Sequence, residues 1–235
     1  MLDQQTADAL VLTCILLNLL AFSFNDEDGN SPEHSWIFRP GDPYQLGWFS
    51  LQLGLKPLLA ATEKFRSGNT MLSWMYELSH HSKTHQPDLL LPAHWESFFT
   101  LNSDDGILLE PARVLARLRN AEPRADSFIL YVQFIGALDM NYRFRNMLEA
   151  RYERAIWLLG YWLGLMCRFN WWWMRPRVNR EWRAVCLWLD QRGVKERPGE
   201  EGRVWRVFMS ELERVGYWPM QVDNSMFTGV ETFVR

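Results

Sequence analysis

The feature that most limits the possible folds is a segment with no charge in its middle. It reads ERAIWLLGYWLGLMCRFNWWWMR (Glu153–Arg175), and no charged residue lies between Arg154 and Arg168. At 3.6 residues per turn its apolar side chains point in every direction, which is the pattern of a helix buried on all sides. The charge-free run, residues 155–167, is shorter than the about 20 apolar residues that cross a bilayer. We therefore expect a central core helix, whose aromatic rings either fill the interior or line a cavity within it.

Two glycines of this segment, Gly160 and Gly164, are four residues apart and share one face of the expected helix. Residues at this spacing are neighbours on a helix surface, so the pair leaves a shallow groove. We expect another helix, or a ligand, to approach the backbone there.

Composition supports one large folded domain. The chain has 235 residues, of which 48% are hydrophobic, and it contains 13 Trp and 14 Phe, so a sizeable aromatic core is available and disorder is excluded for most of its length. The net charge is −3, but residues 143–214 carry a local excess of basic residues, which suits one compact domain. Three widely spaced cysteines, Cys14, Cys167 and Cys186, argue against a disulfide framework and against a structural zinc site.

Hydrophobic periodicity predicts an all-α fold, a single globular domain over residues 1–218 followed by a C-terminal arm at 219–235. No strand pair, hairpin turn or internal repeat is apparent in the sequence. The expected helices span residues 7–22, 45–61, 69–78, 95–100, 111–120, 127–138, 144–174 with a break near Glu149, 178–192 and 202–215. The aromatic triplet Trp36–Phe38 stands between two loops and is expected to pin its segment to the core.

The N-terminal helix is apolar nearly all round, so we interpret it as a second core helix. A membrane anchor is the competing interpretation, but Thr13 and Asn18 lie inside the helix and its length is modest. The acidic N-terminus, with Asp3 and Asp8, does not resemble a secretory signal. We expect no membrane span and a location in the cytoplasm, the nucleus or both.

No catalytic motif is specific enough to assign catalytic residues. His81 and His85 share a metal-ligand spacing, but Pro87 marks a loop and no matching acidic or cysteine ligand follows, so we expect no metal and no cofactor. His94, beside Trp95, could serve as a general base. Asp139 and Glu153 could be acids near a cavity, although nothing in the sequence brings them together.

Four arginines, Arg175, Arg177, Arg180 and Arg183, are interleaved with Trp173 and Trp182. Arginines combined with aromatic rings can hold phosphates and stack bases, so this is the best nucleic-acid candidate in the chain. The simpler interpretation places the arginines on the polar face of one amphipathic helix, where their charges balance those of the acidic part of the chain.

Several segments together resemble the C-terminal regulatory domain of fungal zinc-cluster transcription factors of the sterol uptake control type. They are SWIF (residues 35–38), GWFSLQLGLKPLL (47–59), ARVLARLRNAEP (112–123), ERAIWLLGYWLGLMCRFNWWW (153–173) and WRAVCLWLDQRG (182–193). The likeness extends from about residue 7 to 218. The resemblance implies an all-helical fold with a hydrophobic pocket for ergosterol, where ligand release is linked to nuclear entry and activation. It places the pocket wall in segments 47–59 and 153–173.

The chain departs from that family in one respect. The family carries an N-terminal six-cysteine zinc cluster that contacts DNA, and this chain has three cysteines, none of them clustered. We therefore expect either a fragment, or a shortened protein that keeps the ligand pocket without contacting DNA directly.

Two functions follow from these expectations. The first is a binding module for a sterol or terpenoid-like molecule that acts in transcriptional regulation, with a protein partner or a second copy left open. The second is a cofactor-independent cyclase or isomerase that folds a flexible terpenoid precursor in the same pocket, where an indole N–H or Arg168 would polarise a carbonyl. From helix position, the expected pocket residues are Trp48, Leu51, Gln52, Leu55, Trp157, Tyr161, Trp162, Leu165, Arg168, Phe169 and Trp172.

Overall fold

The computed structural model describes residues 3–23, 31–39, 46–65, 91–100, 106–125, 127–138 and 142–217. Over these residues the chain is all-α, as predicted, with nine α-helices and no strand. The α-helices are α1 (Gln4–Ser23), α2 (Gly47–Ala61), α4 (Ala93–Thr100), α5 (Gly106–Leu118), α6 (Phe128–Ala137), α7 (Arg143–Glu149), α8 (Glu153–Cys167), α9 (Arg175–Gln191) and α10 (Gly199–Val215). Four short 3-10 helices accompany them: η1 (Pro32–His34), η2 (Trp36–Phe38), η3 (Glu63–Phe65) and η5 (Val194–Glu196).

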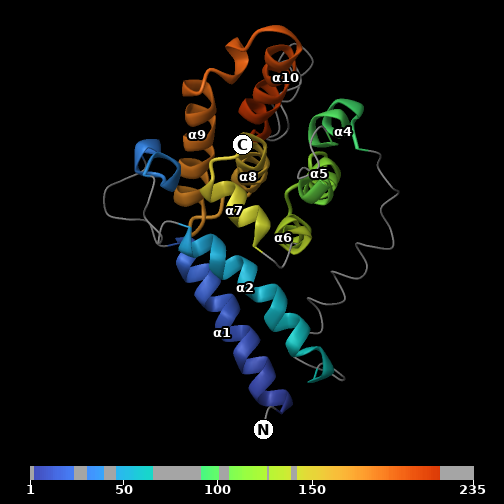
Figure 1. The fold of residues 1–235 in the computed structure, drawn as a ribbon. Coiled ribbons are helices and arrows are strands. Elements are labelled where there is room, and N and C mark those ends of the chain that lie inside the picture. Colours follow the sequence, from blue (N-terminus) through green and yellow to red (C-terminus); the bar gives the residue numbers. More distant parts are fainter. Residues whose placement is uncertain are drawn as a thin grey trace, which may run out of the picture.

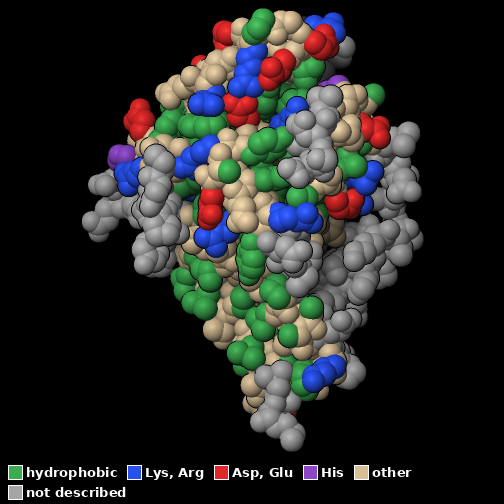
Figure 2. All heavy atoms as spheres, in the orientation of Figure 1, with side chains coloured by type: hydrophobic (Ala, Val, Ile, Leu, Met, Phe, Trp, Pro, Cys, Tyr) green, Lys and Arg blue, Asp and Glu red, His purple; other side chains and the backbone are tan. Residues whose placement is uncertain are grey.

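The helices form two regions, a body and a projecting hairpin (Figure 1). In the body, α8 lies at the centre and packs against α5, α6, α7, α9 and α10. In the hairpin, α1 and α2 pack side by side and run away from the body, with the N-terminus at the far end. Charged side chains gather over the body, whereas the visible hairpin surface is mostly hydrophobic or uncharged (Figure 2).

The central helix is buried as the sequence predicts. Every residue of α8 from Ala155 to Met166 is buried. Its two glycines receive neighbouring helices rather than open space: a Cβ at Gly160 would lie 2.5 Å from Val185 Cγ1 of α9, and one at Gly164 would lie 2.3 Å from Val215 Cγ1 of α10. The glycine face is therefore the surface on which α9 and α10 approach the α8 backbone.

The prediction that the N-terminal helix is a core helix is wrong. Only Ala7, Val11, Asn18 and Phe22 of α1 are buried, and these residues form the line that faces α2. The other sides of α1 are largely open to solvent, and Leu16 is 58% exposed. Within the described residues, α1 is the one helix long and apolar enough to cross a bilayer, judged by length and composition alone.

One expected helix boundary is confirmed, and two others differ clearly from the predictions. The expected break near Glu149 is present, because Arg151 adopts a left-handed conformation (φ 58°) between α7 and α8. The central helix ends at Cys167 instead of continuing to Met174. Helix α5 begins at Gly106, so Pro111 lies inside the helix rather than in its first turn.

The aromatic triplet fixes its segment to the core, as predicted. Trp36 and Ile37 are 4% and 2% exposed, and the Arg151 guanidinium stacks 4.6 Å from the centre of the Trp36 ring. Arg151 Nη2 also donates to the Trp36 carbonyl oxygen at 2.9 Å. The predicted helix at 69–78, the histidines at 81 and 85, Asp139 and the arm at 219–235 lie outside the described residues.

Candidate functional site

The α8 residues expected to line a pocket are packed into the core. Trp157 and Leu165 are 0% exposed, and Tyr161 and Trp162 are 2% exposed. Both indole N–H groups are satisfied by the protein, since Trp157 Nε1 donates to the Phe208 carbonyl and Trp162 Nε1 to the Tyr131 carbonyl, each at 2.9 Å. A buried indole needs such an acceptor, and here the backbone of α10 and α6 provides it. These side chains tie α8 to its neighbours.

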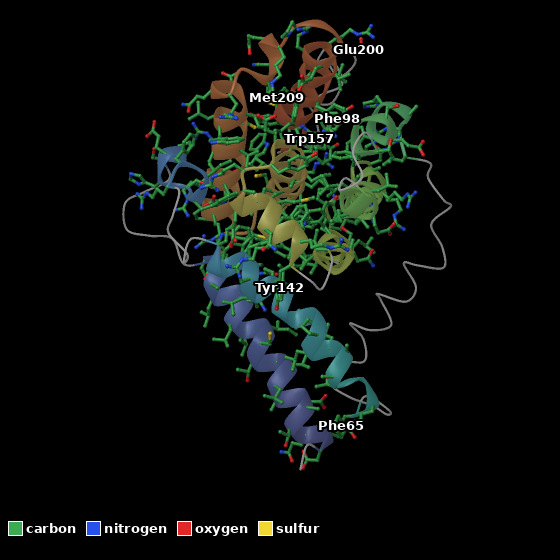
Figure 3. The ribbon with its side chains drawn as sticks, in the orientation of Figure 1. Phe65, Phe98, Tyr142, Trp157, Glu200 and Met209 are labelled. Carbon is green, nitrogen blue, oxygen red and sulfur yellow. The ribbon has the colours of Figure 1, made fainter. Side chains whose placement is uncertain are left out.

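A cluster of aromatic rings fills the upper body around Trp157 (Figure 3). Trp157 stacks on Tyr161 at 4.8 Å between ring centroids, and Trp95 of α4 meets both rings edge-on at 5.1 Å. Phe98 of α4 stacks on Phe208 of α10 at 4.0 Å. Burial raises the pKa of the Tyr161 hydroxyl above its ordinary value, so this phenol stays neutral. The cluster joins α4, α8 and α10 as one core.

A second aromatic group lies where the hairpin meets the body, and we call it the junction. Phe22, near the C-terminal end of α1, lies 5.2 Å from Trp48 of α2, 6.3 Å from Trp162 of α8 and 6.4 Å from Trp173. Phe49 of α2 continues the group, 6.1 Å from Phe144 of α7. The junction therefore brings together the two segments, 47–59 and 153–173, that the sequence analysis assigned to a pocket wall.

Unlike Trp157 and Trp162, but like Trp36, Trp48 has a buried indole N–H without a hydrogen-bond partner among the described residues. The Trp48 side chain is 5% exposed. The Arg177 guanidinium lies over the Trp48 ring at 5.8 Å, and Arg177 Nε donates to the Phe22 carbonyl at 3.0 Å. The junction therefore combines apolar rings with one buried donor that lacks an acceptor.

The other expected pocket residues are dispersed. Gln52 and Leu55 of α2 are partly buried, while Leu51 is 41% exposed on the hairpin surface. Phe169 is buried against Tyr131 at 4.6 Å, on the α6 side of the body. Trp172 is 83% exposed, so it does not belong to either aromatic group.

Arg168 follows α8 and holds the ends of two other helices. It is 9% exposed, and burial lowers the pKa of its guanidinium below the ordinary value. Its Nε donates to the Val215 carbonyl and its Nη1 to the Arg119 carbonyl, each at 2.8 Å. These carbonyls lie at the C-terminal ends of α10 and α5, where helix dipoles favour a positive charge. This arrangement supports a structural role for Arg168, in place of the expected carbonyl-polarising role.

Sequence reasoning missed a buried polar cluster formed by Ser35, Arg180 and Glu181. Glu181 is 1% exposed, accepts a short hydrogen bond from Ser35 Oγ and receives Arg180 Nη2 at 2.9 Å. Arg180 is 3% exposed, and its Nη1 has no partner among the described residues. Ser35 and Glu181 are 146 positions apart, so no local pattern could have revealed the contact.

The arginine row expected to face solvent is divided by the fold. Arg175 and Arg183 are exposed, but Arg180 is buried and Arg177 is partly buried at the junction. Trp182, one of the interleaved rings, is 8% exposed and donates from Nε1 to the Leu212 carbonyl at 3.0 Å. The four arginines therefore do not form one continuous exposed surface, and the nucleic-acid interpretation loses its basis.

The remaining titratable candidates are engaged in ion pairs and hydrogen bonds. His94 Nε2 lies 2.9 Å from Glu211 Oε1, and Trp95 Nε1 donates to the other oxygen of that carboxylate at 2.8 Å. Glu153 pairs with Arg197 at 2.6 Å. Among the described residues, no group of three or more His, Cys, Asp or Glu side chains lies in a position to hold a metal ion.

A scan against protein-family models gave no match for this chain, and searches of curated proteins and of solved structures gave none either. The resemblance to sterol uptake regulators therefore rests on the sequence segments alone.

Proposed function

We propose that this chain is a binding module for a bulky, mostly apolar molecule of the sterol or terpenoid class, which it binds at the junction. The observation that carries this proposal is the unsatisfied Nε1 of Trp48 within a group of aromatic rings. A buried donor without an acceptor costs about 1–3 kcal/mol, and a hydroxyl or carbonyl oxygen of a ligand would remove that cost. Small-molecule sites typically combine apolar walls with a few such polar groups.

The composition of the junction supports an apolar ligand with one oxygen. Phe22 and Phe49 present aromatic faces beside Trp48, and each is at most 3% exposed. The Trp162 ring packs against Phe22 in the same group, but its N–H already donates to the Tyr131 carbonyl and cannot serve a ligand. The hydrogen-bonding capacity that a ligand would complete therefore lies on the α2 side, at Trp48.

Binding at this position would couple the hairpin to the body. Among the described contacts, α1 reaches the body through Phe22 and through its carbonyl, which accepts from Arg177. A molecule that touches both Trp48 and Trp162 would favour one placement of α1 and α2 relative to α8, because a ligand stabilises the state it binds best. By the resemblance, such a change would regulate transcription through a partner that supplies the DNA contacts, in the cytoplasm or nucleus.

The cyclase alternative has less support. It needs a donor directed at a reacting carbonyl, and the candidate Arg168 donates two of its N–H groups to the carbonyls of Val215 and Arg119. No contact among the described residues favours the enzyme over the binding module, so we propose the binding module alone.

The test compares two tryptophan variants and two sterols. Trp48→Phe keeps an aromatic ring but removes the free N–H, so we expect ergosterol to bind about tenfold more weakly. The same sterol without its hydroxyl group should bind the wild-type protein and the variant equally. Trp172→Phe is the matched control, because Trp172 is 83% exposed, and its affinity should equal that of the wild type. Isothermal titration calorimetry measures all five affinities.

Two results would contradict the proposal. One is an absence of binding for ergosterol and for terpenoid ligands by the wild-type protein. The other is an equal loss of affinity for both sterols in Trp48→Phe, which would mean that the indole N–H does not contact the ligand oxygen.

A further inference from the structure

Helix α1 carries a second, mostly apolar line opposite the one that faces α2, and we call it the outer seam. The α2-facing line consists of Ala7, Val11, Asn18 and Phe22, all buried. The outer seam consists of Ala9, Thr13, Leu16 and Leu20, all exposed. Its spacing of four, three and four residues is the step pattern by which one helix packs along another. Leu16 and Leu20, at 58% and 52% exposed, are the most exposed leucines of α1.

We propose that the outer seam binds the outer seam of a second copy of this chain, with the two α1 helices antiparallel. In that arrangement Ala9 faces Leu20 of the second copy, and Thr13 faces its Leu16. Each small side chain then meets a large one, so the pair fills space evenly along four contacts. A parallel arrangement would place Ala9 against Ala9 and Leu16 against Leu16, so the separation that suits the small pair at one end would not suit the large pair at the other.

The shape of the molecule also favours the antiparallel pair. The hairpin projects from the body, and the N-terminus lies at the free end of α1 (Figure 1). Antiparallel pairing places the two bodies at opposite ends of the α1 pair, separated by about 30 Å for a helix of this length. Parallel pairing would place both bodies at the same end of the α1 pair.

Charge agrees with this orientation. Asp3 and Asp8 are the acidic residues at the free end of α1, and Arg175 is exposed at the first position of α9, two residues before the Arg177 that contacts Phe22. Antiparallel pairing brings the acidic end of each copy toward the Arg175 end of the other. It also opposes the two helix dipoles favourably.

A lipid bilayer is the other occupant that the apolar surface of α1 suggests. The outer seam has small residues in its first half, Ala9 and Thr13, and large ones in its second half, Leu16 and Leu20, so it is complementary to a reversed copy of itself, and a fluid hydrocarbon phase would gain nothing from that arrangement. A matching helix gains close packing from it, which is why the second copy is the occupant we infer.

The first experiment measures oligomeric state by light scattering after size exclusion, over a concentration series. We expect the wild-type protein to dimerise. We expect Leu16→Glu, and likewise Leu20→Glu, to raise the dimer dissociation constant about a hundredfold or more, because each would bury an unpaired carboxylate. Leu10→Glu is the matched control: it adds the same charge on α1 at a 42% exposed leucine to one side of the seam, and it should dimerise like the wild type. A wild-type protein that stays monomeric over the whole series would overturn the proposal.

The second experiment tests the orientation by disulfide formation in a Cys14→Ala background. A mixture of Ala9→Cys and Leu20→Cys chains should form a cross-linked dimer, whereas neither variant alone should. In the antiparallel pair, two copies of position 9 are separated by about 16 Å, too far for a disulfide. Cross-linking of Ala9→Cys with itself would reject the antiparallel pair. Flotation of the wild-type protein with phosphatidylcholine vesicles, abolished by Leu16→Glu, would identify the bilayer as the occupant and overturn the proposal.

Discussion

The body and the hairpin are built from similarly apolar helices but bury very different parts of them. In α8, every residue from Ala155 to Met166 is buried, whereas in α1 only four positions are. The difference follows from the number of neighbours: α8 is surrounded by five helices, and α1 packs along α2 and touches the body at its C-terminal end. The fraction of an apolar helix that is buried therefore depends on how many other helices pack around it.

The two regions also differ in how their buried polar groups are hydrogen-bonded. In the body, Glu181 is bonded by Ser35 and Arg180, so its charge is compensated. In the hairpin, Asn18 lies in the line facing α2; its Nδ2 donates to the Cys14 carbonyl at 2.9 Å, but its Oδ1 has no partner among the described residues. The buried charge of the body is therefore paired, although Arg180 Nη1 has no partner among the described residues, whereas the hairpin buries a neutral amide whose oxygen has none there.

The largest expected effect comes from breaking the paired cluster. Glu181→Ala should lower the free energy of unfolding by about 3–5 kcal/mol, because it leaves Arg180 buried without its counter-charge. The counterpart in the hairpin, Asn18→Leu, should leave stability unchanged or raise it, because it removes an unsatisfied buried oxygen. Urea denaturation followed by circular dichroism measures both. Equal losses in the two variants would mean that the contrast between the regions is wrong.

An intermediate effect is expected from adding one methyl group to a helical glycine in each region. Gly164→Ala should cost about 1–3 kcal/mol, since the new Cβ would lie 2.3 Å from Val215 Cγ1 and α10 would have to move. Gly54→Ala in α2 has no atom within 4 Å of the new Cβ, and it should stabilise the protein by about 0.5–1 kcal/mol through helix propensity. Opposite signs in thermal denaturation would confirm the difference in packing. A stabilising Gly164→Ala would contradict it.

The last prediction concerns cysteine reactivity, which compares the same two regions without changing stability. Burial raises the pKa of the Cys186 thiol to about 12, and it raises that of Cys167 as well, so under native conditions both thiols should react with iodoacetamide very slowly. An increase of about three pKa units reduces the thiolate of Cys186 about a thousandfold. Burial raises the pKa of the Cys14 thiol as well, and all three cysteines are half-buried, but Cys14 lies on the more exposed α1, so we expect it to be modified first. Peptide mass spectrometry over time identifies the order, and a faster reaction at Cys186 would disprove the expected order.

The sequence predicted the burial of α8 because a charge-free run with apolar residues on every side has few other solutions. The same argument failed for α1, which looks equally apolar. The distinguishing information lies in what packs against each helix: Gly160 and Gly164 admit α9 and α10, and α1 has no comparable pair. Helix ends were less predictable, since the turn after Cys167 depends on Arg168 reaching carbonyls at residues 119 and 215.

The candidate site was predictable by segment but not by residue. The resemblance assigned segments 47–59 and 153–173 to one pocket wall, and in the structure both segments contact Phe22, which was not among the expected residues. The orphan Nε1 of Trp48 could not be inferred, because whether an indole finds an acceptor depends on the fold around it. Trp172 was expected in the pocket and is exposed instead, because a run of consecutive aromatic residues does not indicate which ring faces solvent.

The glycine face of α8 has a consequence for the order in which the chain folds. The groove at Gly160 and Gly164 is filled by Val185 of α9 and by Leu212 and Val215 of α10, all of which are synthesised after α8. During translation the central helix, which is buried from Ala155 to Met166 in the folded protein, therefore remains incompletely covered until residue 215 has emerged, while the contacts between α1 and α2 connect segments closer in sequence and form earlier. The body, although it is the better packed region, is the one exposed to chaperones and to misassembly while the chain is made.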